Sequence, residues 1–173
     1  MEQWCISCDY GTVNPASFGL WGLQNGVWYR TAEYYYDSRR AGQQKTDLEY
    51  EQALSQLAGE RKISRVVVDP SAASFIEVLR RKGWPVVKAK NDVLSGIRTT
   101  ARLLRDGKIV ICRECRDAIR EFGLYRWEED APSDRVVKQN DHAMDDIRYF
   151  AATVADRPKG TMFVSSVPRR SRV

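Results

Sequence analysis

Several patterns are missing from this 173-residue chain, and each absence excludes a class of protein. No apolar run approaches the ~18 residues of a membrane span, and no signal-peptide pattern follows Met1. We therefore expect a soluble, intracellular type of protein with no membrane partner. The motif G-x-x-x-x-G-K-[ST] is absent, so we expect no nucleotide-hydrolysing motor and no bound nucleotide. There is no internal repeat or low-complexity block, and the length suits one domain.

Cysteine is scarce, but its spacing needs an explanation. The four cysteines fall as CISC (Cys5, Cys8) and CREC (Cys112, Cys115), which on paper is the paired pattern of a zinc site. Cys5 and Cys8 lie in a strand-like segment, however, where residues three apart point to opposite faces and cannot share one tetrahedral metal. We therefore expect reduced cysteines and no zinc.

The charge balance is weakly basic. Lys and Arg number 28 against 23 Asp and Glu, which gives a net charge of +5 and a pI near 9.1. This excess favours a nucleic acid over a membrane as partner. Four arginines and several turn residues, without clear periodicity, follow Asp156. We expect a domain over residues 1–156 and a loose basic tail over 157–173.

The order of predicted elements indicates an α/β sheet with an antiparallel edge. Three strands form an antiparallel meander, in which QNG is a strong hairpin signal and precedes the third strand. A Thr46/Glu49 capping box then opens a helix that ends near Gly59. Strands and helices alternate after it, and a closing helix follows. The predicted strands are 4–9, 17–23, 27–37, 64–68, 84–90 and 108–111, and the later helices are 71–83, 91–107, 113–123 and 141–154.

The closing helix concentrates polar residues at its start. Ala143, Ile147 and Phe150 recur at helical spacing and predict one buried face. His142, the only histidine, and Asp145 lie one turn apart on the other side, and Asp146 flanks the same polar strip. Asn140 or Asp141 can cap the start. Such acidic groups can simply complement the helix dipole in solvent, and a lone histidine is usually structural.

Two more aspartates favour a metal site over that reading. Asp9 ends the first strand and Asp69 ends the fourth, and each precedes a turn. Taken singly, both are ordinary turn residues. Because ligands bind outside the carboxyl ends of strands in open sheets, the two can face each other if their strands are neighbours. With the acidic helix supplying a third carboxylate, the set suits a hard divalent cation such as Mg²⁺ or Mn²⁺.

Four segments carry a resemblance to a known family. CDYGTVNPASFGLWGL, VVVDPSAASF, KNDVLSGIR and VKQNDHAMDDIRYF resemble the nuclease domain of tailed-phage terminase large subunits. The similarity runs from about residue 4 to 154. It implies a ribonuclease H-like mixed sheet, three antiparallel strands followed by parallel ones, flanked by helices. Terminases join an N-terminal packaging ATPase to this nuclease, and the ATPase pattern is absent here.

The resemblance also implies site residues. Asp9, Asp69 and Asp145 fall on the family's acidic metal ligands, and His142 on the histidine beside the last of them. Asp146 departs from the family, which usually has a small residue there. Helical spacing alone leaves either Asp145 or Asp146 as the third ligand, and the resemblance favours Asp145.

The implied function is a metal-dependent endonuclease with two divalent cations, Mn²⁺ or Mg²⁺, that cuts double-stranded concatemeric viral DNA with little sequence specificity during packaging. The expected partners are DNA, the ATPase domain of the same subunit, the portal and the terminase small subunit. The expected location is the host cytoplasm at the procapsid portal, and the isolated domain should be monomeric.

Candidate DNA contacts are weaker. Arg98, Arg102 and Arg105 form one stripe of a helix whose Leu94, Ile97, Ala101 and Leu104 should face the core, although a solvated face is the simpler explanation. Lys138, just before the acidic cluster, is the better placed candidate.

Three other functions compete. A Holliday-junction resolvase uses a similar fold and acidic set. The DYGT turn followed by a hairpin resembles the phosphate loop of actin-like ATPases and sugar kinases, for which 173 residues are too few. A non-catalytic DNA-binding module of the same fold is the third.

Overall fold

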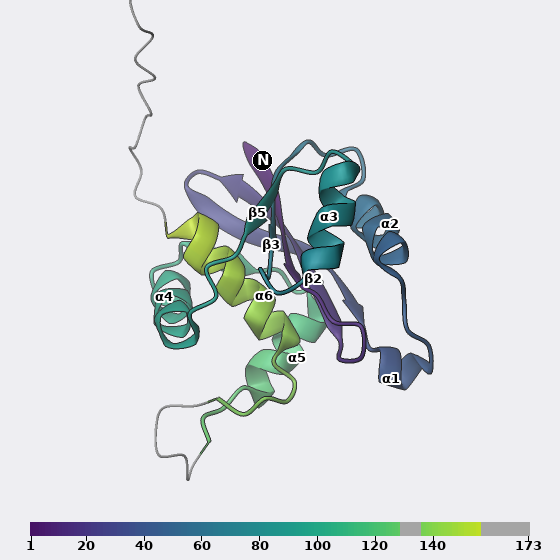
Figure 1. Ribbon diagram of the computed structural model, residues 1–173. Coiled ribbons are helices and arrows are strands. Elements are labelled where there is room, and N and C mark those ends of the chain that lie inside the picture. Colours follow the sequence, from purple (N-terminus) through teal and green to yellow (C-terminus); the bar gives the residue numbers. More distant parts are fainter. Residues whose placement is uncertain (129–135, 157–173) are drawn as a thin grey trace, which may run out of the picture.

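A six-stranded mixed sheet forms the centre of the computed structural model, which describes residues 1–128 and 136–156 (Figure 1). The strand order is β5-β4-β1-β2-β3-β6. The strands are β1 Gln3–Asp9, β2 Ala16–Gln24, β3 Val27–Tyr36, β4 Ile63–Val68, β5 Val86–Lys88 and β6 Ile109–Ile111. β1, β2 and β3 pair antiparallel, whereas β4, β5 and β6 add in parallel. The predicted mixed sheet is confirmed.

Local sequence signals explain the meander and the first long helix. Asn25 and Gly26 have φ values of 51° and 75°, the left-handed conformation that a two-residue hairpin between β2 and β3 requires. The capping box is present, because Thr46 accepts from the Glu49 amide while the Glu49 carboxylate accepts from the Thr46 amide. Helix α2 then runs over Asp47–Ala58.

Helices cover both faces of the sheet (Figure 1). One face packs against α2 and α3 (Ala73–Arg81), and the other against α4 (Val93–Arg105), α5 (Arg116–Leu124) and α6 (His142–Phe150). A short helix, α1 (Ser38–Ala41), follows β3, and a π-helical turn (Ala151–Ala155) continues α6. Each face has its own buried apolar cluster, so the sheet is covered on both sides.

The cysteines of β1 follow this division. Cys5 belongs to the cluster under α4, α5 and α6, and Cys8 to the cluster under α2 and α3. The two side chains therefore point to opposite faces, as the strand reading predicted. Cys115 is also buried, and its thiol donates to the Arg30 carbonyl.

The core-facing side of α4 differs from the prediction. Leu103 and Gly96 are its buried residues, whereas Ala101 is exposed. The apolar stripe is therefore rotated, because a buried side chain from α6, Arg148, passes over Gly96. The expected tail over 157–173 lies outside the described residues. Among the described residues, no helix has the length and apolarity to cross a membrane.

Candidate active site

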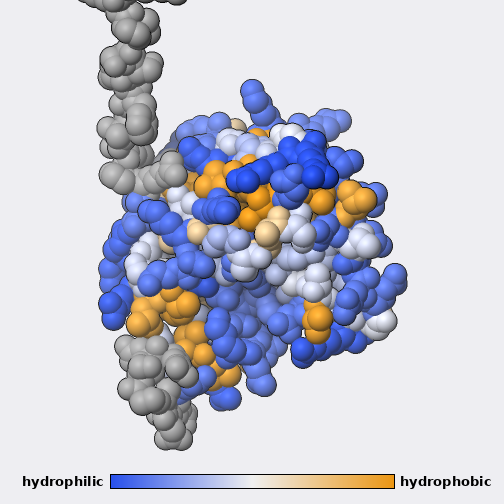
Figure 2. All heavy atoms as spheres, in the orientation of Figure 1, coloured by the Kyte–Doolittle hydropathy of each residue, from blue (hydrophilic) through white to orange (hydrophobic). Residues whose placement is uncertain are grey.

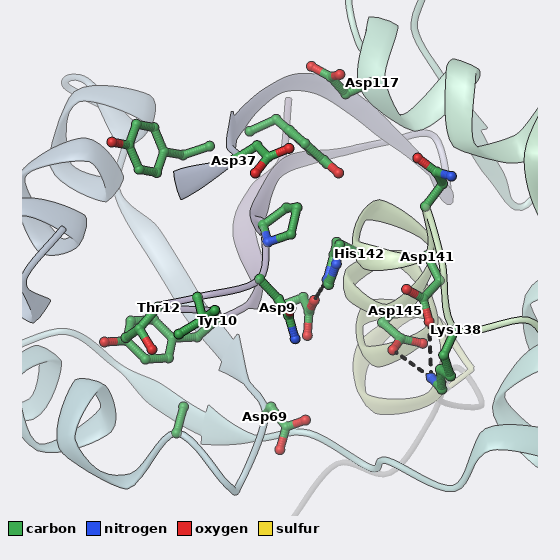
Figure 3. A pocket seen from close by; sticks show the side chains of 18 of the residues that line it. Asp9, Tyr10, Thr12, Asp37, Asp69, Asp117, Lys138, Asp141, His142 and Asp145 are labelled. Atoms are coloured by element: carbon green, nitrogen blue, oxygen red, sulfur yellow. Dashed lines mark hydrogen bonds and ion pairs between the residues drawn. The ribbon is translucent and has the colours of Figure 1, made fainter. Parts of the chain in front are cut away.

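A cleft of about 1540 Å³ opens at the carboxyl ends of β1 and β4. These strands are parallel neighbours with Cys8 opposite Val68, so the next residues, Asp9 and Asp69, emerge side by side at the same edge. His142 and Asp145 line the cleft from the first turn of α6 (Figure 3). The structure thus brings all four sequence-predicted residues to one cavity.

Asp9 is paired with the only histidine. His142 Nδ1 lies 2.9 Å from Asp9 Oδ2, and both side chains are largely buried. Burial raises the pKa of Asp9 to about 6, against the stabilising hydrogen bond with His142. Burial alone would lower the pKa of His142, but its contact with Asp9 raises that pKa above the ordinary value. The two groups therefore form a coupled pair that can exchange a proton.

Asp69 is held by a tyrosine and a turn. The Tyr149 hydroxyl donates to Asp69 Oδ2 at 2.6 Å, and the Ser71 amide donates to Oδ1 at 2.8 Å. Burial opposes ionisation, but these two donors outweigh it and lower the pKa of the Asp69 carboxyl. Asp69 is thus a fixed, ionised group on the cleft wall.

Asp145 is held between two cations. Arg148 Nη2 donates to its Oδ1 at 2.9 Å, and Lys138 Nζ lies 3.2 Å from its Oδ2. Lys138 also lies 3.2 Å from Asp141, a fourth carboxylate that lines the cleft (Figure 3). Lys138 is mostly exposed, whereas the Arg148 side chain is buried. One oxygen of Asp145 is therefore fixed from inside the protein, and the other faces a cation that solvent can reach.

Arg148 also ties α6 to the segment before α4. Its Nη1 donates to the carbonyl of Asn91 at 2.9 Å and reaches that of Asp92 at 3.4 Å. A Cβ atom on Gly96 would lie 2.6 Å from Arg148 Cγ, so the glycine makes room for this side chain. Burial would lower the pKa of Arg148, but Asp145 raises it. A charged guanidinium therefore sets the position of Asp145.

Asp146 does not share the polar strip that helical spacing predicted for it. Its side chain is fully buried and accepts from Arg30 Nη2 at 2.9 Å, from Ser7 at 2.7 Å and from Ser17. A Cβ on Gly19 would meet the Arg30 guanidinium, so that position must stay small. Asp146 is not among the residues that line the cleft. The 100° step between adjacent helical residues turns Asp146 toward the sheet and leaves Asp145 in the cleft.

The start of α6 is capped from another helix. Asp141 is the N-cap residue, but its side chain makes no capping hydrogen bond. Glu121 of α5 accepts instead from the Ala143 amide at 2.7 Å and from the Tyr35 hydroxyl at 2.6 Å. The expectation that the side chain of Asn140 or Asp141 caps this helix is therefore wrong, because a buried carboxylate takes the free amide.

The predicted arginine stripe on α4 lies outside the cleft. Arg98, Arg102 and Arg105 are exposed, and none of them lines the cavity. Arg102 pairs with Asp156, and Arg105 pairs with Asp106. The structure brings only Lys138, of the four predicted DNA contacts, to the carboxylates.

The donor set suits a hard divalent cation in type, since carboxylate oxygens are the ligands that Mg²⁺ and Mn²⁺ prefer. Within the described ranges, 1–128 and 136–156, no three His, Cys, Asp or Glu side chains lie close enough together to enclose a metal ion. Asp145 explains part of this, because both of its oxygens contact cationic side chains. A cation at Asp145 would compete with Lys138, the more exposed of the two.

Comparisons with known proteins support the reading of this cleft. No protein-family model matches the chain, and no curated protein does. Among solved structures, the nuclease domain of the P22 large terminase is 20% identical and covers 87% of this chain and 80% of its own, with a TM-score of 0.71. The large terminase nuclease of thermophilic phage G20c, solved with bound magnesium, is 16% identical over 87% of this chain and 81% of its own, with a TM-score of 0.67.

A closer likeness in sequence decides the relationship. A full-length large terminase from another thermophilic bacteriophage, solved in complex with ADP, is 49% identical over 90% of this chain, with a TM-score of 0.87. The chain is similar to large terminases and has the fold of their nuclease domains. It spans 40% of the length of that ADP-bound terminase.

Sequence reasoning missed several residues of this terminase-like cleft. Tyr149 and Arg148, which hold two of the aspartates, gave no signal because they appeared only as members of an amphipathic helix. Arg39, Arg40 and Arg120 also line the cleft. The DSRR sequence after β3 was the one signal that could have drawn attention to the first two.

Proposed function

We propose that this chain is a metal-dependent endonuclease that cuts double-stranded concatemeric viral DNA, with little sequence specificity, during genome packaging. One observation carries the proposal. Asp9, Asp69 and Asp145 come from three separate elements and line one cleft, in a chain that is 49% identical to a large terminase. The magnesium bound to the G20c nuclease, which shares the fold, supports a divalent cation as cofactor.

Each aspartate would have a distinct role toward two cations, Mn²⁺ or Mg²⁺. Asp9 lies between the other two elements and would be the shared ligand, with Asp69 holding one ion and Asp145 the other. Two such ions, when bound, activate a water and stabilise charge on the phosphate and on the leaving 3′ oxygen. Asp146 would remain outside the ligand set, because Arg30 and two serines already occupy its oxygens.

Neighbouring side chains would hold these ligands in place. Tyr149 fixes one oxygen of Asp69, and Arg148 fixes one oxygen of Asp145. Such supporting hydrogen bonds orient ligands and tune their basicity. His142, in contact with Asp9, would orient that carboxylate and take up or release a proton as the substrate is cleaved.

The partners would follow from this role. The substrate is duplex DNA, and an ATPase domain of the same subunit would move it, as the large terminase solved with ADP suggests. The portal and the terminase small subunit would complete the machine at the procapsid in the host cytoplasm. The modest net charge of +5 suggests that isolated nuclease binds DNA weakly, so that cutting depends on the motor presenting DNA to it.

Plasmid cleavage tests the proposal. Supercoiled and linear duplex are incubated with the full chain in Mn²⁺, in Mg²⁺ or in EDTA, beside a four-way junction and an ATPase assay. We expect metal-dependent loss of both duplex forms without ATP turnover. Preference for the junction would instead select the resolvase, and ATP turnover would select the actin-like class.

Substitutions in the first turn of α6 complete the test. Asp145→Ala should eliminate cleavage, and His142→Ala should retain an intermediate rate because an orienting group contributes less than a ligand. Metal-dependent cleavage that survives Asp145→Ala at the wild-type rate would remove Asp145 from the site. DNA binding without any cleavage by the wild-type chain would favour the non-catalytic module.

A further inference from the structure

Five cationic side chains line the cleft: Arg39, Arg40, Arg120, Lys138 and Arg148. Three of them are already paired with carboxylates. Arg120 lies 3.2 Å from Asp117, and both Lys138 and Arg148 contact Asp145. In the part of the chain that the structure describes, Arg39 and Arg40 form no ion pair. They are therefore the cleft's uncompensated positive charges.

Helix α1 holds these two arginines on a fixed support. The Asp37 carboxylate accepts from the backbone amides of Arg39 and Arg40, and Gly42 ends the helix with a φ of 70°. The buried Ser38 hydroxyl donates to the Val13 carbonyl, which anchors the helix to the turn after β1. A four-residue helix with both ends capped and one side tied down is a built platform, not a fraying segment.

The guanidinium groups themselves remain available. Both side chains are exposed, and the contact of Arg39 is with the neutral amide oxygen of Asn14 at 3.0 Å. In Figure 1, α1 lies on one side of the turn between β1 and β2, and α5 lies on the other. Hydrophilic side chains predominate on this face between the two helices (Figure 2). The cleft thus has a basic wall opposite α5 and α6, with the carboxylates between.

We propose that α1 is a phosphate-binding platform on which Arg39 and Arg40 hold the backbone of duplex DNA across the cleft. The proposal rests on the proposed function in taking DNA as the polyanion. The platform supplies no sequence reading, because guanidinium contacts to phosphates position a duplex without distinguishing bases. The stripe of Arg98, Arg102 and Arg105 is the competing surface, and two of its members are already ion-paired.

DNA binding without cleavage tests the platform. Fluorescence anisotropy of a labelled duplex is measured in EDTA from about 50 to 200 mM salt for the full chain and its variants. The double variant Arg39→Ala/Arg40→Ala should bind more weakly, by the same factor for different sequences. The slope of log affinity against log salt should become shallower by about 1.8, because each phosphate contact contributes about 0.9. Arg39→Lys/Arg40→Lys should keep the slope.

A matched control removes the same charge elsewhere. Arg80 and Arg81 are also adjacent, exposed and in the last turn of a helix, but they do not line the cleft. Arg80→Ala/Arg81→Ala should leave the slope near the wild-type value. Equal losses in the two double variants would overturn the platform, because they would show a general charge effect. A larger loss in Arg98→Ala/Arg102→Ala would place the DNA on α4 and overturn it too.

The cleavage assay separates this proposal from the proposed function. A wild-type chain that cleaves DNA, with an Arg39→Ala/Arg40→Ala variant that binds as tightly as wild type, would refute the platform alone. Loss of binding in that variant, with no cleavage by the wild type in any metal, would support the platform and refute the nuclease.

Discussion

Two neighbouring aspartates at the start of α6 occupy opposite environments. Asp146 is fully buried against the sheet, where Arg30 and two serines satisfy its oxygens. Asp145 lines the cleft, where buried Arg148 and exposed Lys138 share its oxygens. Both carboxylates have an arginine partner. The difference is that one partner set is closed to solvent and complete, whereas the other includes a cation that can leave.

The comparison distinguishes carboxylates that build the fold from those available for chemistry. Removing one member of a buried ion pair leaves the other unpaired in a low-dielectric interior, which is strongly destabilising. A carboxylate beside an exposed lysine loses much less when its partner changes, because water replaces it. Substitutions in the two environments should therefore separate stability from activity.

The largest effect is expected for Asp146→Ala. It would leave the fully buried Arg30 guanidinium without its main partner, at a cost of about 3–5 kcal/mol in the free energy of unfolding. Thermal and urea unfolding followed by circular dichroism measure the loss. Asp156→Ala, which breaks the exposed pair with Arg102, is the control and should change stability by less than about 1 kcal/mol. Similar stabilities for both variants would contradict the buried-pair reading.

Asp9→Asn should instead act on activity. It removes the proposed shared ligand, and we expect cleavage to fall at least about 100-fold, or about 2.7 kcal/mol in transition-state stabilisation. Plasmid nicking in Mn²⁺ measures this fall.

Stability of the Asp9→Asn variant should move the other way. Burial raises the pKa of Asp9 to about 6, above its unfolded value near 3.8, so ionised Asp9 disfavours the fold as pH rises through that window. In EDTA at pH 7, the thermal midpoint of the variant should therefore match or exceed that of the wild type. Nicking above a few per cent of the wild-type rate would disprove the shared-ligand role.

Gly96→Ala should disturb Asp145 from a distance. The new Cβ would lie 2.6 Å from Arg148 Cγ, so the arginine must shift away from Asp145. We expect a loss of about 1–3 kcal/mol in stability from overpacking, and a higher Mn²⁺ concentration for half-maximal cleavage. Gly123→Ala is the matched control, since nothing lies within 4 Å of its added Cβ. An unchanged metal requirement in folded Gly96→Ala would show that Arg148 does not position Asp145.

The sequence predicted the order of elements because its local signals agreed with the fold. The hairpin at Asn25 and Gly26, the Thr46 capping box and the apolar runs of β1 and β4 each act over a few residues. The convergence of Asp9 and Asp69 was predictable for the same reason, once their strands were taken as parallel neighbours.

The remaining site residues depend on contacts between distant elements. Glu121 caps α6 across 22 residues, and Arg30 reaches Asp146 across 116. Helical spacing also could not assign Asp145 and Asp146 to environments, because the exact rotation of α6 depends on what the sheet offers beneath it. Gly19 and the serines of β1 and β2 make that pocket, and the arrangement requires the folded sheet.

The smallest expected effect tests the exposed partner of Asp145. Lys138 is 59% exposed and lies 3.2 Å from both Asp141 and Asp145, so a cation at Asp145 must compete with it. Because exposed ion pairs contribute about 0.2–1 kcal/mol, Lys138→Met should tighten Mn²⁺ binding by about two- to five-fold in titration calorimetry without DNA. Lys88→Met, at an exposed position outside the cleft, removes the same charge and should leave the affinity nearly unchanged. Equal tightening by both variants would mean that net charge acts at long range. Weaker Mn²⁺ binding in Lys138→Met alone would mean that the lysine organises the site, and the contrast between a closed Asp146 and an exchangeable Asp145 would then fail.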